Sequence, residues 1–201
     1  MKKYLKVLLK YAYYSFINPM LKWLVSPMFD RKYLRGRYFD IGYQGWGWVW
    51  RSIWLQKFFG FNRNVPWPVS PFIAIDDPKN IVFDPNDLNN FQHFGCYYSN
   101  CGGGRIVIGK GTWIAPNVGI ITTNHNPYNL ESHKTPGDVI IGEKCWIGMN
   151  SVILPGVHLG DNTVVGAGAV VKRSYPNGHC VIAGVPATII KHLNEEGFDY
   201  P

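Results

Sequence analysis

The side chains best suited to proton transfer in this chain are its histidines. There are six of them, namely His93, His125, His133, His158, His179 and His192. Imidazole has an ordinary pKa of about 6.5, so near neutral pH it can take a proton from a hydroxyl group and give it back. By residue type alone the six are equivalent. The segments around them must therefore decide which one has a chemical role.

The cysteines, by contrast, carry no pattern of metal binding. They are Cys96, Cys101, Cys145 and Cys180, with no C-x-x-C pair and no zinc-ligand spacing. The sequence therefore predicts reduced thiols and no metal ion. Lysines interrupt the apolar start of the chain, no small-residue cleavage site follows it, and no apolar run reaches the roughly 18 residues of a spanning helix. We accordingly expect a cytoplasmic protein.

A six-residue repeat in the second half of the chain indicates the fold. Aliphatic residues recur every six positions, at Ile108, Ile114 and Ile120 and again at Ile141, Ile147, Ile153, Leu159, Val165 and Val171. A helix needs a period of about 3.6 residues and an ordinary strand a period of about 2, so neither explains the pattern. A chain that coils with short, flat faces and points each aliphatic residue inward does explain it. We therefore predict an all-β solenoid over residues 61–201, whose first coils lie before residue 105.

The two aliphatic series are out of phase. Ile120 and Ile141 are 21 residues apart, which is not a multiple of six. A loop of roughly 15 residues must therefore leave the coil between about 124 and 138, and an insertion of that length in a regular solenoid is usually functional. His125 and His133 fall within it. Beyond Pro186 we expect a short helix, Ala187 to Asn194, that caps the open end of the coil.

Residues 1–60 differ from the rest in charge and aromatic content. They hold eleven Lys or Arg and two Asp or Glu, whereas residues 61–201 hold nine and eleven. Lys3, Lys6 and Lys10 share one side of an expected helix, and five of the eight tryptophans fall here. Such a segment suits the inner face of the cell membrane or a lipid-linked glycan. Packing on the coil or between subunits is the alternative, and Trp46-Gly47-Trp48 could instead stack on sugar rings.

Six segments follow one another in a fixed order after residue 112. They are Trp113-Ile114-Ala115-Pro116-Asn117-Val118, Thr123-Asn124-His125-Asn126, Cys145-Trp146-Ile147-Gly148, Ile153-Leu154-Pro155-Gly156-Val157, Val165-Gly166-Ala167-Gly168-Ala169-Val170-Val171 and Ala183-Gly184-Val185-Pro186-Ala187. Residues from about 81 to 191 thereby resemble the hexapeptide-repeat acyltransferases, among them the galactoside, maltose, serine and capsular-polysaccharide O-acetyltransferases. The resemblance implies a left-handed parallel β-helix and a homotrimer with active sites between subunits. It also implies O-acetyl transfer from acetyl-CoA.

The resemblance further implies roles for single residues. His125 stands where the family keeps its catalytic imidazole, so it would be the general base, and we expect the other histidines on surfaces or at corners. Trp146, whose indole N–H donates but cannot accept, would hold a carbonyl or sugar oxygen, stack on a sugar, or simply pack a corner. Galactoside-type relatives use an early-coil Asn near the acetyl group or acceptor, but Gly95 stands at that position here. The remaining candidates for acceptor binding are Asn124, Tyr98 and Asn100.

The acetyl-CoA slot implied by the resemblance runs along the edge of the coil and uses mostly backbone groups. The matching positions are Met149, Ala167, Lys172, Arg173 and Lys191. The side chains of Lys172, Arg173 and Lys191 suit the CoA phosphates as charge-assisted donors. The alternative is that they are solvated surface charges. Met149 replaces a small polar residue that is common in relatives, so we expect its backbone to make the contact.

Several alternatives stay open at this point. The phrases Phe83-Asp84-Pro85 and Phe94-Gly95-Cys96 and the aromatic N-terminus favour a bacterial surface polysaccharide, or its lipid-linked precursor, as acceptor over a small free sugar or antibiotic. A γ-type carbonic anhydrase would need three converging histidines, and here His125 and His133 lie eight residues apart in one loop. A catalytically inactive structural solenoid is the third reading. No helix-turn-helix, OB-type or finger pattern favours nucleic-acid binding.

Overall fold

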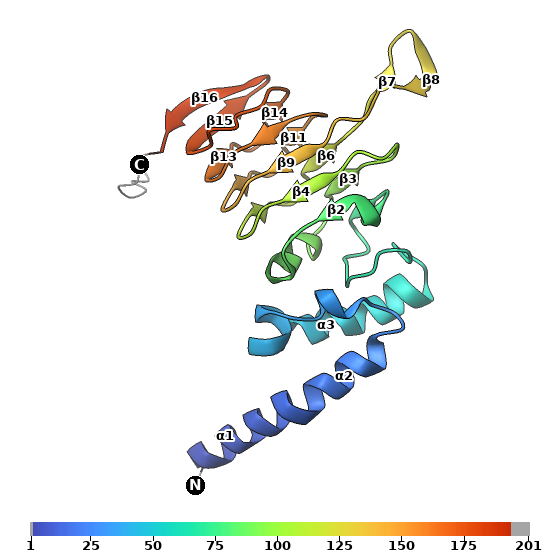
Figure 1. The fold of residues 1–201 in the computed structure, drawn as a ribbon, viewed down its shortest axis with the longest axis vertical. Coiled ribbons are helices and arrows are strands. Elements are labelled where there is room, and N and C mark those ends of the chain that lie inside the picture. The colour runs from blue at the N-terminus through green and yellow to red at the C-terminus, as the bar shows by residue number, and fades with distance from the viewer. Residues whose placement is uncertain (1, 194–201) are drawn as a thin grey trace. The chain divides into compact units, whose positions relative to one another are not determined.

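The computed structural model describes residues 2–193, without the side chains of residues 2, 3, 6 and 9. The chain divides into two compact units between Val69 and Ser70 (Figure 1). The sequence predicts a division after residue 60. The structure divides the chain after Val69, because residues 61–69 pack with the helices. The buried Gln56 side chain donates to the carbonyls of Val65 and Trp67 and accepts from the backbone of Val69.

The N-terminal unit consists of helices and short helical turns. α1 (Lys2–Ala12), the π-helical η1 (Tyr13–Ile17) and α2 (Asn18–Val25) follow one another with helical dihedrals at their joints, so they form one continuous helix. Pro19, which lacks an N–H, stands next to the π-helical turn and removes one ordinary helical hydrogen bond. The later elements are η2 (Arg31–Tyr33), η3 (Arg37–Ile41), α3 (Gln44–Ser52) and η4 (Ile53–Phe58).

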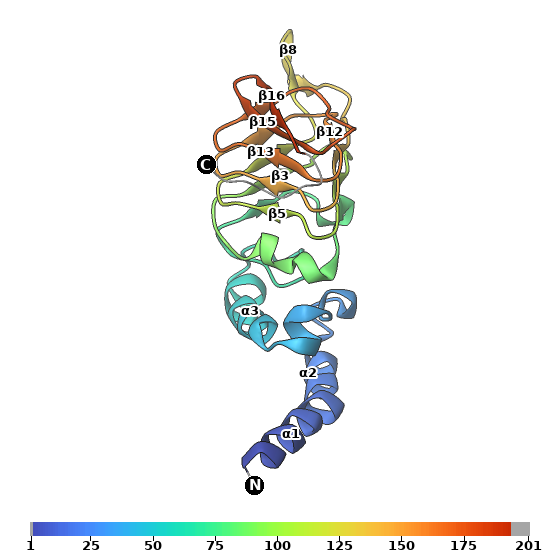
Figure 2. The same cartoon turned by 90° about the vertical axis from the view of Figure 1, so that its left-hand side faces the viewer.

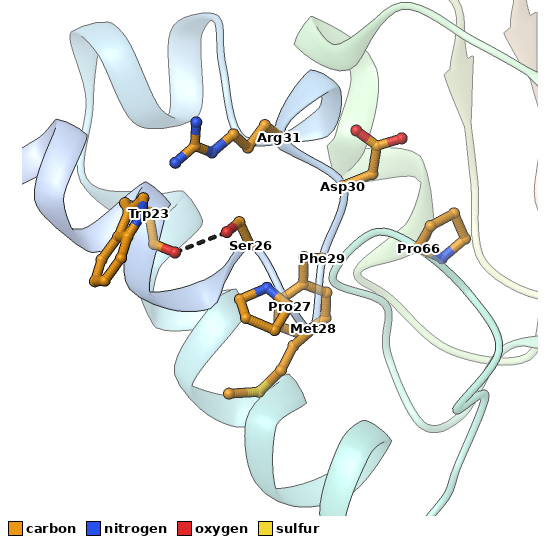
Figure 3. A pocket seen from close by; sticks show the side chains of 8 residues that line it. All are labelled: Trp23, Ser26, Pro27, Met28, Phe29, Asp30, Arg31 and Pro66. Carbon is orange, nitrogen blue, oxygen red and sulfur yellow. Dashed lines mark hydrogen bonds between the residues drawn. The ribbon is translucent and has the colours of Figure 1, made fainter.

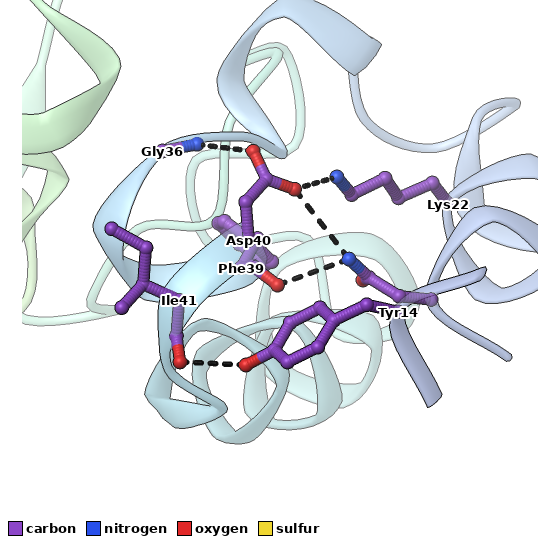
Figure 4. A network of polar contacts seen from close by, with 7 residues as sticks. Tyr14, Lys22, Gly36, Phe39, Asp40 and Ile41 are labelled. Carbon is purple, nitrogen blue, oxygen red and sulfur yellow. Dashed lines mark hydrogen bonds and ion pairs between the residues drawn. The ribbon is translucent and has the colours of Figure 1, made fainter. Parts of the chain in front are cut away.

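Polar side chains fasten the long helix to the rest of this unit (Figure 4). The Tyr14 hydroxyl donates to the carbonyl of Ile41 at 2.6 Å, and the Asn18 amide donates to the carbonyl of Phe39 at 3.0 Å. Lys22 forms an ion pair with Asp40, whose second oxygen accepts the backbone N–H of Gly36. Within residues 2–193 no helix is both long and apolar enough to cross a bilayer.

The second unit is a stack of short parallel strands on three sheets. The first sheet has the order β1 (Ala74–Ile75), β3 (Tyr97–Ser99), β6 (Gly119–Ile121), β11 (Val152–Ile153), β14 (Val170–Val171). The second has β5 (Trp113–Ile114), β10 (Trp146–Ile147), β13 (Thr163–Val165), β15 (Cys180–Gly184), β16 (Ala187–His192). The third has β2 (Ile81–Val82), β4 (Ile106–Ile108), β9 (Val139–Ile141), β12 (His158–Leu159). From β4 to β14 the chain visits the three sheets in turn, and η5 (Pro78–Asn80) and η6 (Pro85–Phe91) interrupt the earlier coils.

The six-residue series forms the core, as the sequence predicts. Ile147 pairs with Ile114 on one side and Val165 on the other, and the other two sheets stack their aliphatic residues in the same way. All nine residues of the two series are buried. The chain before residue 105 contributes parallel strands as well, because β1, β2 and β3 join the sheets of the later strands.

The expected C-terminal helix is wrong. Residues 187–192 form strand β16, which pairs antiparallel with β15, and Asn194 lies outside the described residues. Gly184, at φ 99°, and Pro186 reverse the chain there. Thr188, Ile189 and Ile190 are β-branched and favour a strand over a helix.

Candidate active site

The predicted loop is a β-hairpin that leaves the coil after β6 (Figures 1 and 2). Strand β7 (His125–Asn126) pairs antiparallel with β8 (Asn129–His133), so that His125 lies opposite His133. The Asn126 side chain accepts the backbone N–H of Tyr128 at 3.0 Å and shapes the turn. This hairpin takes up the residues that break the six-residue phase.

The foot of the hairpin is fixed to the coil. The Thr123 hydroxyl donates to the carbonyl of Lys134 at 3.1 Å, and the Lys134 N–H donates to the carbonyl of Asn124 at 2.8 Å. Asp138 accepts from both the backbone and the side chain of Arg105 at 2.9 Å, and these hydrogen bonds lower the pKa of its carboxyl. The two strands of the hairpin therefore start and end at defined positions.

The imidazole of His125 is exposed and held in one tautomer. Its Nδ1 lies 2.7 Å from the carbonyl oxygen of Leu130. A carbonyl oxygen can only accept a hydrogen bond, so Nδ1 must carry the proton. In the neutral ring, Nε2 then has the free lone pair and can accept a proton from another molecule. This is the arrangement that a general base requires.

His133 lies against His125 across the hairpin. Their ring centroids are 4.3 Å apart and their planes are inclined by 36°. Among residues 2–193 no group of three or more His, Cys, Asp or Glu side chains is arranged to hold a metal ion. A γ-type carbonic anhydrase would need three converging histidines. The described part of the chain brings two together, His125 and His133.

One edge of the coil connects the hairpin with Lys172 and Arg173. The hairpin follows β6, and the two cations follow β14 in the same sheet. Backbone hydrogen bonds run along this edge, from the Gly137 N–H to Thr122 at 2.8 Å and from the Gly156 N–H to Gly137 at 3.2 Å. Lys172 and Arg173 are exposed, so this edge presents a cationic pair two strands along the sheet from β6, the strand that leads to His125.

The opposite edge of the same sheet carries Met149 and Ala167. Both are exposed, at the turns after β10 and β13, and the N–H of Gly168 donates to the carbonyl of Met149 at 2.8 Å. Gly168 has φ 70°, a conformation that disfavours a side chain. The edge is therefore open to the close approach of an extended chain.

The same edge holds an amide that the sequence reasoning missed. A side chain at Gly95 would begin 1.7 Å from Oδ1 of Asn117, so the Asn117 carboxamide fills the space that Gly95 leaves empty. Asn117 is exposed and has φ 60°. The segment Ala115-Pro116-Asn117 was a possible signal, since asparagine tolerates the left-handed conformation at a corner. Its position beside Gly95 depends on how two coils stack.

Trp146 lies on the second sheet, away from both edges. Strand pairing sets it in one outward row with Trp113 and Val164, and that row continues through Val181 to Lys191. Trp113, Trp146 and Lys191 are exposed. A single chain therefore holds the hairpin and this row on different faces of the coil unit.

Two of the three residues that the sequence analysis names for acceptor binding lie inside the protein. Tyr98 is 1 % exposed, its hydroxyl donates to the carbonyl of Asn90, and burial raises the pKa of its phenol. Asn100 is fully buried and binds the backbone N–H and carbonyl of Asp77 at 2.8 and 2.7 Å. Of the three candidates Asn124, next to His125, is the exposed one.

The buried thiols are poorly suited to carry an acyl group. Burial raises the pKa of Cys96 to about 11 and also raises those of Cys145 and Cys180. Because the thiolate is the nucleophile, these three side chains are inert near neutral pH.

Comparison with known proteins shows which family the chain resembles. Residues 138–173 match the family model "Bacterial transferase hexapeptide (six repeats)". The Escherichia coli protein WcaF, named for acetyl transfer in colanic acid biosynthesis, is 35% identical over 146 residues, which cover 73% of this chain and 76% of the relative. The Escherichia coli protein WbbJ, named for O-acetyl transfer in lipopolysaccharide biosynthesis, is 37% identical over 129 residues, which cover 58% of this chain and 62% of WbbJ.

A solved structure shares the architecture. The crystal structure of a maltose O-acetyltransferase from Clostridium difficile superimposes with a TM-score of 0.51 at 31% identity and covers 61% of this chain and 64% of that one. The chain spans less than two thirds of the length of several curated relatives that it matches.

Proposed function

The chain belongs to the hexapeptide-repeat acetyltransferases, and from this premise we propose that it transfers an acetyl group from acetyl-CoA to a sugar hydroxyl. The acceptor that we propose is a bacterial surface polysaccharide or its lipid-linked precursor. The names of WcaF and WbbJ support this class of acceptor. The observation that carries the chemistry is the hydrogen bond between Nδ1 of His125 and the carbonyl of Leu130.

In the proposed reaction His125 is the general base. Nε2 takes the proton of the acceptor hydroxyl as that oxygen attacks the thioester carbonyl carbon. The carbon–sulfur bond then breaks, and the proton passes from Nε2 to the leaving sulfur, so the products are the acetyl ester and CoA. The imidazolium formed on the way keeps Nδ1–H on the Leu130 carbonyl, which stabilises its charge and holds the ring in place.

Donors near the tetrahedral intermediate would complete the site. The carboxamides of Asn124 and Asn117 are exposed, and the Trp146 indole N–H is a further donor. We assign the acetyl-CoA slot to the edge with Met149 and Ala167, because its backbone is accessible there. Lys191 would bind the CoA phosphates, as would Lys172 and Arg173, which lie at the opposite edge of the sheet in one chain and would therefore reach the slot across a subunit interface.

The placement of these residues supports a homotrimer. In one chain the hairpin and the row from Trp113 to Lys191 occupy different faces, so a neighbouring copy has to bring the second set to the first. We infer that the coil is a left-handed parallel β-helix, as in the family, and that each site lies between two subunits. Sedimentation will measure the mass of the assembly, and a fully active monomer would contradict this arrangement.

The direct test is release of CoA from acetyl-CoA. Purified protein is offered bacterial surface polysaccharides, lipid-linked precursors and small free sugars in parallel. We expect turnover with a polysaccharide or precursor and none with small sugars alone. Turnover restricted to a small sugar would replace the acceptor class, and an absence of acetyl-CoA binding in calorimetry would leave an inactive structural coil.

A further inference from the structure

The long helix of the N-terminal unit points polar side chains into the protein and apolar ones outward, which is the reverse of an ordinary surface helix. Its polar side chains Tyr14, Asn18 and Lys22, spaced by four residues, point into the unit and hold it together. The other side carries Phe16, Met20 and Trp23, which are 71, 53 and 64% exposed. These positions are spaced by four and three residues, so they form one outward apolar strip, which Ile17 and Leu24 flank.

A second exposed strip lies on the other helix of this unit. Trp50, Trp54 and Phe58 are spaced by four residues along α3 and η4, and all three are exposed. Their rings meet edge to face, with centroids 6.0 Å apart from Trp50 to Trp54 and 5.9 Å apart from Trp54 to Phe58. The opposite side of this helix is buried. A cluster of exposed aromatic rings indicates a surface that binds an apolar partner, such as a protein or a membrane.

Trp23 also borders an open hollow of about 770 Å³ that follows α2 (Figure 3). Apolar side chains, among them Pro27 and Met28, line part of it, and Arg31 and Asp30 line another part. The Arg31 side chain is exposed. Within the described part of the chain, its guanidinium makes no ion pair or side-chain hydrogen bond. An apolar wall next to a guanidinium suits the acyl–phosphate boundary of a phospholipid.

The charge of the unit selects among possible partners. Residues 1–69 hold twelve Lys or Arg and two Asp or Glu, and no acidic residue precedes Asp30. Lys10 is exposed; the side chains of Lys3 and Lys6, which the sequence groups with it, lie outside the described residues. Two such units placed strip to strip would bring like charges together, which is unfavourable. An anionic surface instead gains from every cation near it.

We propose that the strip Phe16–Met20–Trp23 and the Arg31 hollow form a docking surface for an anionic phospholipid membrane. The apolar side chains enter the boundary between headgroups and acyl chains, and the cations meet lipid phosphates. The exposed strip of Trp50, Trp54 and Phe58 offers further aromatic contact. This surface would bring the enzyme to a lipid-linked acceptor, but the docking itself does not depend on the proposed acetyl transfer.

Vesicle flotation tests the proposal on the full chain. Vesicles of phosphatidylcholine, with and without phosphatidylglycerol, are mixed with protein at low and high salt. We expect binding that requires phosphatidylglycerol and weakens with salt. Phe16→Ser should lower the partition constant about tenfold, and Phe16→Ser combined with Met20→Ser and Trp23→Ser should abolish flotation. Arg31→Gln should give a smaller, salt-sensitive loss.

The matched control is Phe72→Ser, because Phe72 lies in the coil unit and is 73% exposed, much like Phe16. It should bind vesicles like the unaltered protein. Circular dichroism and CoA release with a soluble acceptor check that the triple variant is folded and active. Absence of flotation by the unaltered protein would overturn the proposal, as would equal loss in the control. A triple variant that loses oligomers instead of vesicle binding would assign the strip to contacts between copies.

Discussion

In the coil unit the nine aliphatic residues of the repeat are buried, whereas in the N-terminal unit Phe16, Trp23, Trp50 and Phe58 each leave about two thirds of their surface exposed. Charge divides in the same way, with a net charge of +10 on residues 1–69 and −3 on residues 70–201. The coil buries the aliphatic residues of its repeat. The helical unit directs the polar side chains of Tyr14, Asn18 and Lys22 inward and leaves several aromatic side chains exposed.

Our proposals give the chemistry to the coil unit and the membrane contact to the helical unit, and a substitution can separate the two. His125→Ala should reduce turnover about a hundredfold to ten-thousandfold, because it removes the side chain that we propose as the general base. Vesicle binding and thermal unfolding should stay unchanged, since the side chain is exposed. The control is His158→Ala, an exposed histidine on β12. Half of the original turnover in His125→Ala would remove this residue from the mechanism.

The contrast in burial predicts a large loss in the free energy of unfolding for a substitution in the coil and almost none for one on the exposed strip. Ile147→Ala should lower the free energy of unfolding by about 2 to 5 kcal/mol, because it opens a cavity between Ile114 and Val165. Met20→Ala, on the exposed strip, should change it by less than about 0.5 kcal/mol. Denaturant unfolding monitored by circular dichroism measures both. Equal losses would mean that the strip is covered in solution.

A finer test concerns the partner of the base. His133→Ala should lower turnover about threefold to tenfold, because the ring that packs against His125 at a tilt would help to hold its plane. His133→Phe keeps an aromatic ring and should restore most of the rate. Steady-state kinetics would place the loss in kcat while KM for acetyl-CoA is kept. If Ala and Phe behave alike, stacking has no part in positioning the base.

The smallest effect should appear in the helical unit at low pH. Burial opposes the charged form of Asp40, but hydrogen bonds from Lys22 and the Gly36 N–H outweigh it and lower the pKa of the carboxyl. The stabilisation is therefore present above the unfolded pKa of about 4 and is lost as the pH falls through the lowered value. For this half-exposed pair it should be at most about 1 kcal/mol. Tryptophan fluorescence should detect the loss, and Asp40→Asn should remove its pH dependence.

The repeat could be predicted because its register is local. Each buried position, such as Ile147 or Ile153, lies six residues from its neighbour in the chain, so spacing alone identifies it. Features that depend on contacts between coils were not accessible. The burial of Tyr98 and Asn100 and the Asn117 amide beside Gly95 arise only when successive coils stack.

The surroundings of His125 illustrate a second limit. The break in phase predicts an excursion around it, but the partner that fixes its tautomer is the main-chain carbonyl of Leu130. A carbonyl group is present at every position and leaves no mark in the sequence. The mistaken helix at 187–192 has a related cause, since β-branched residues there found a strand edge to pair with.

That returning strand has a consequence for the stack as a whole. Parallel strands that add one above another have no inherent last member, because each new strand offers the next the same hydrogen-bonding edge. Strand β16 runs the opposite way along β15, with a bulge between Val181 and Ile182, and occupies the edge that another parallel strand would take. The reversal thus ends the parallel series of that sheet.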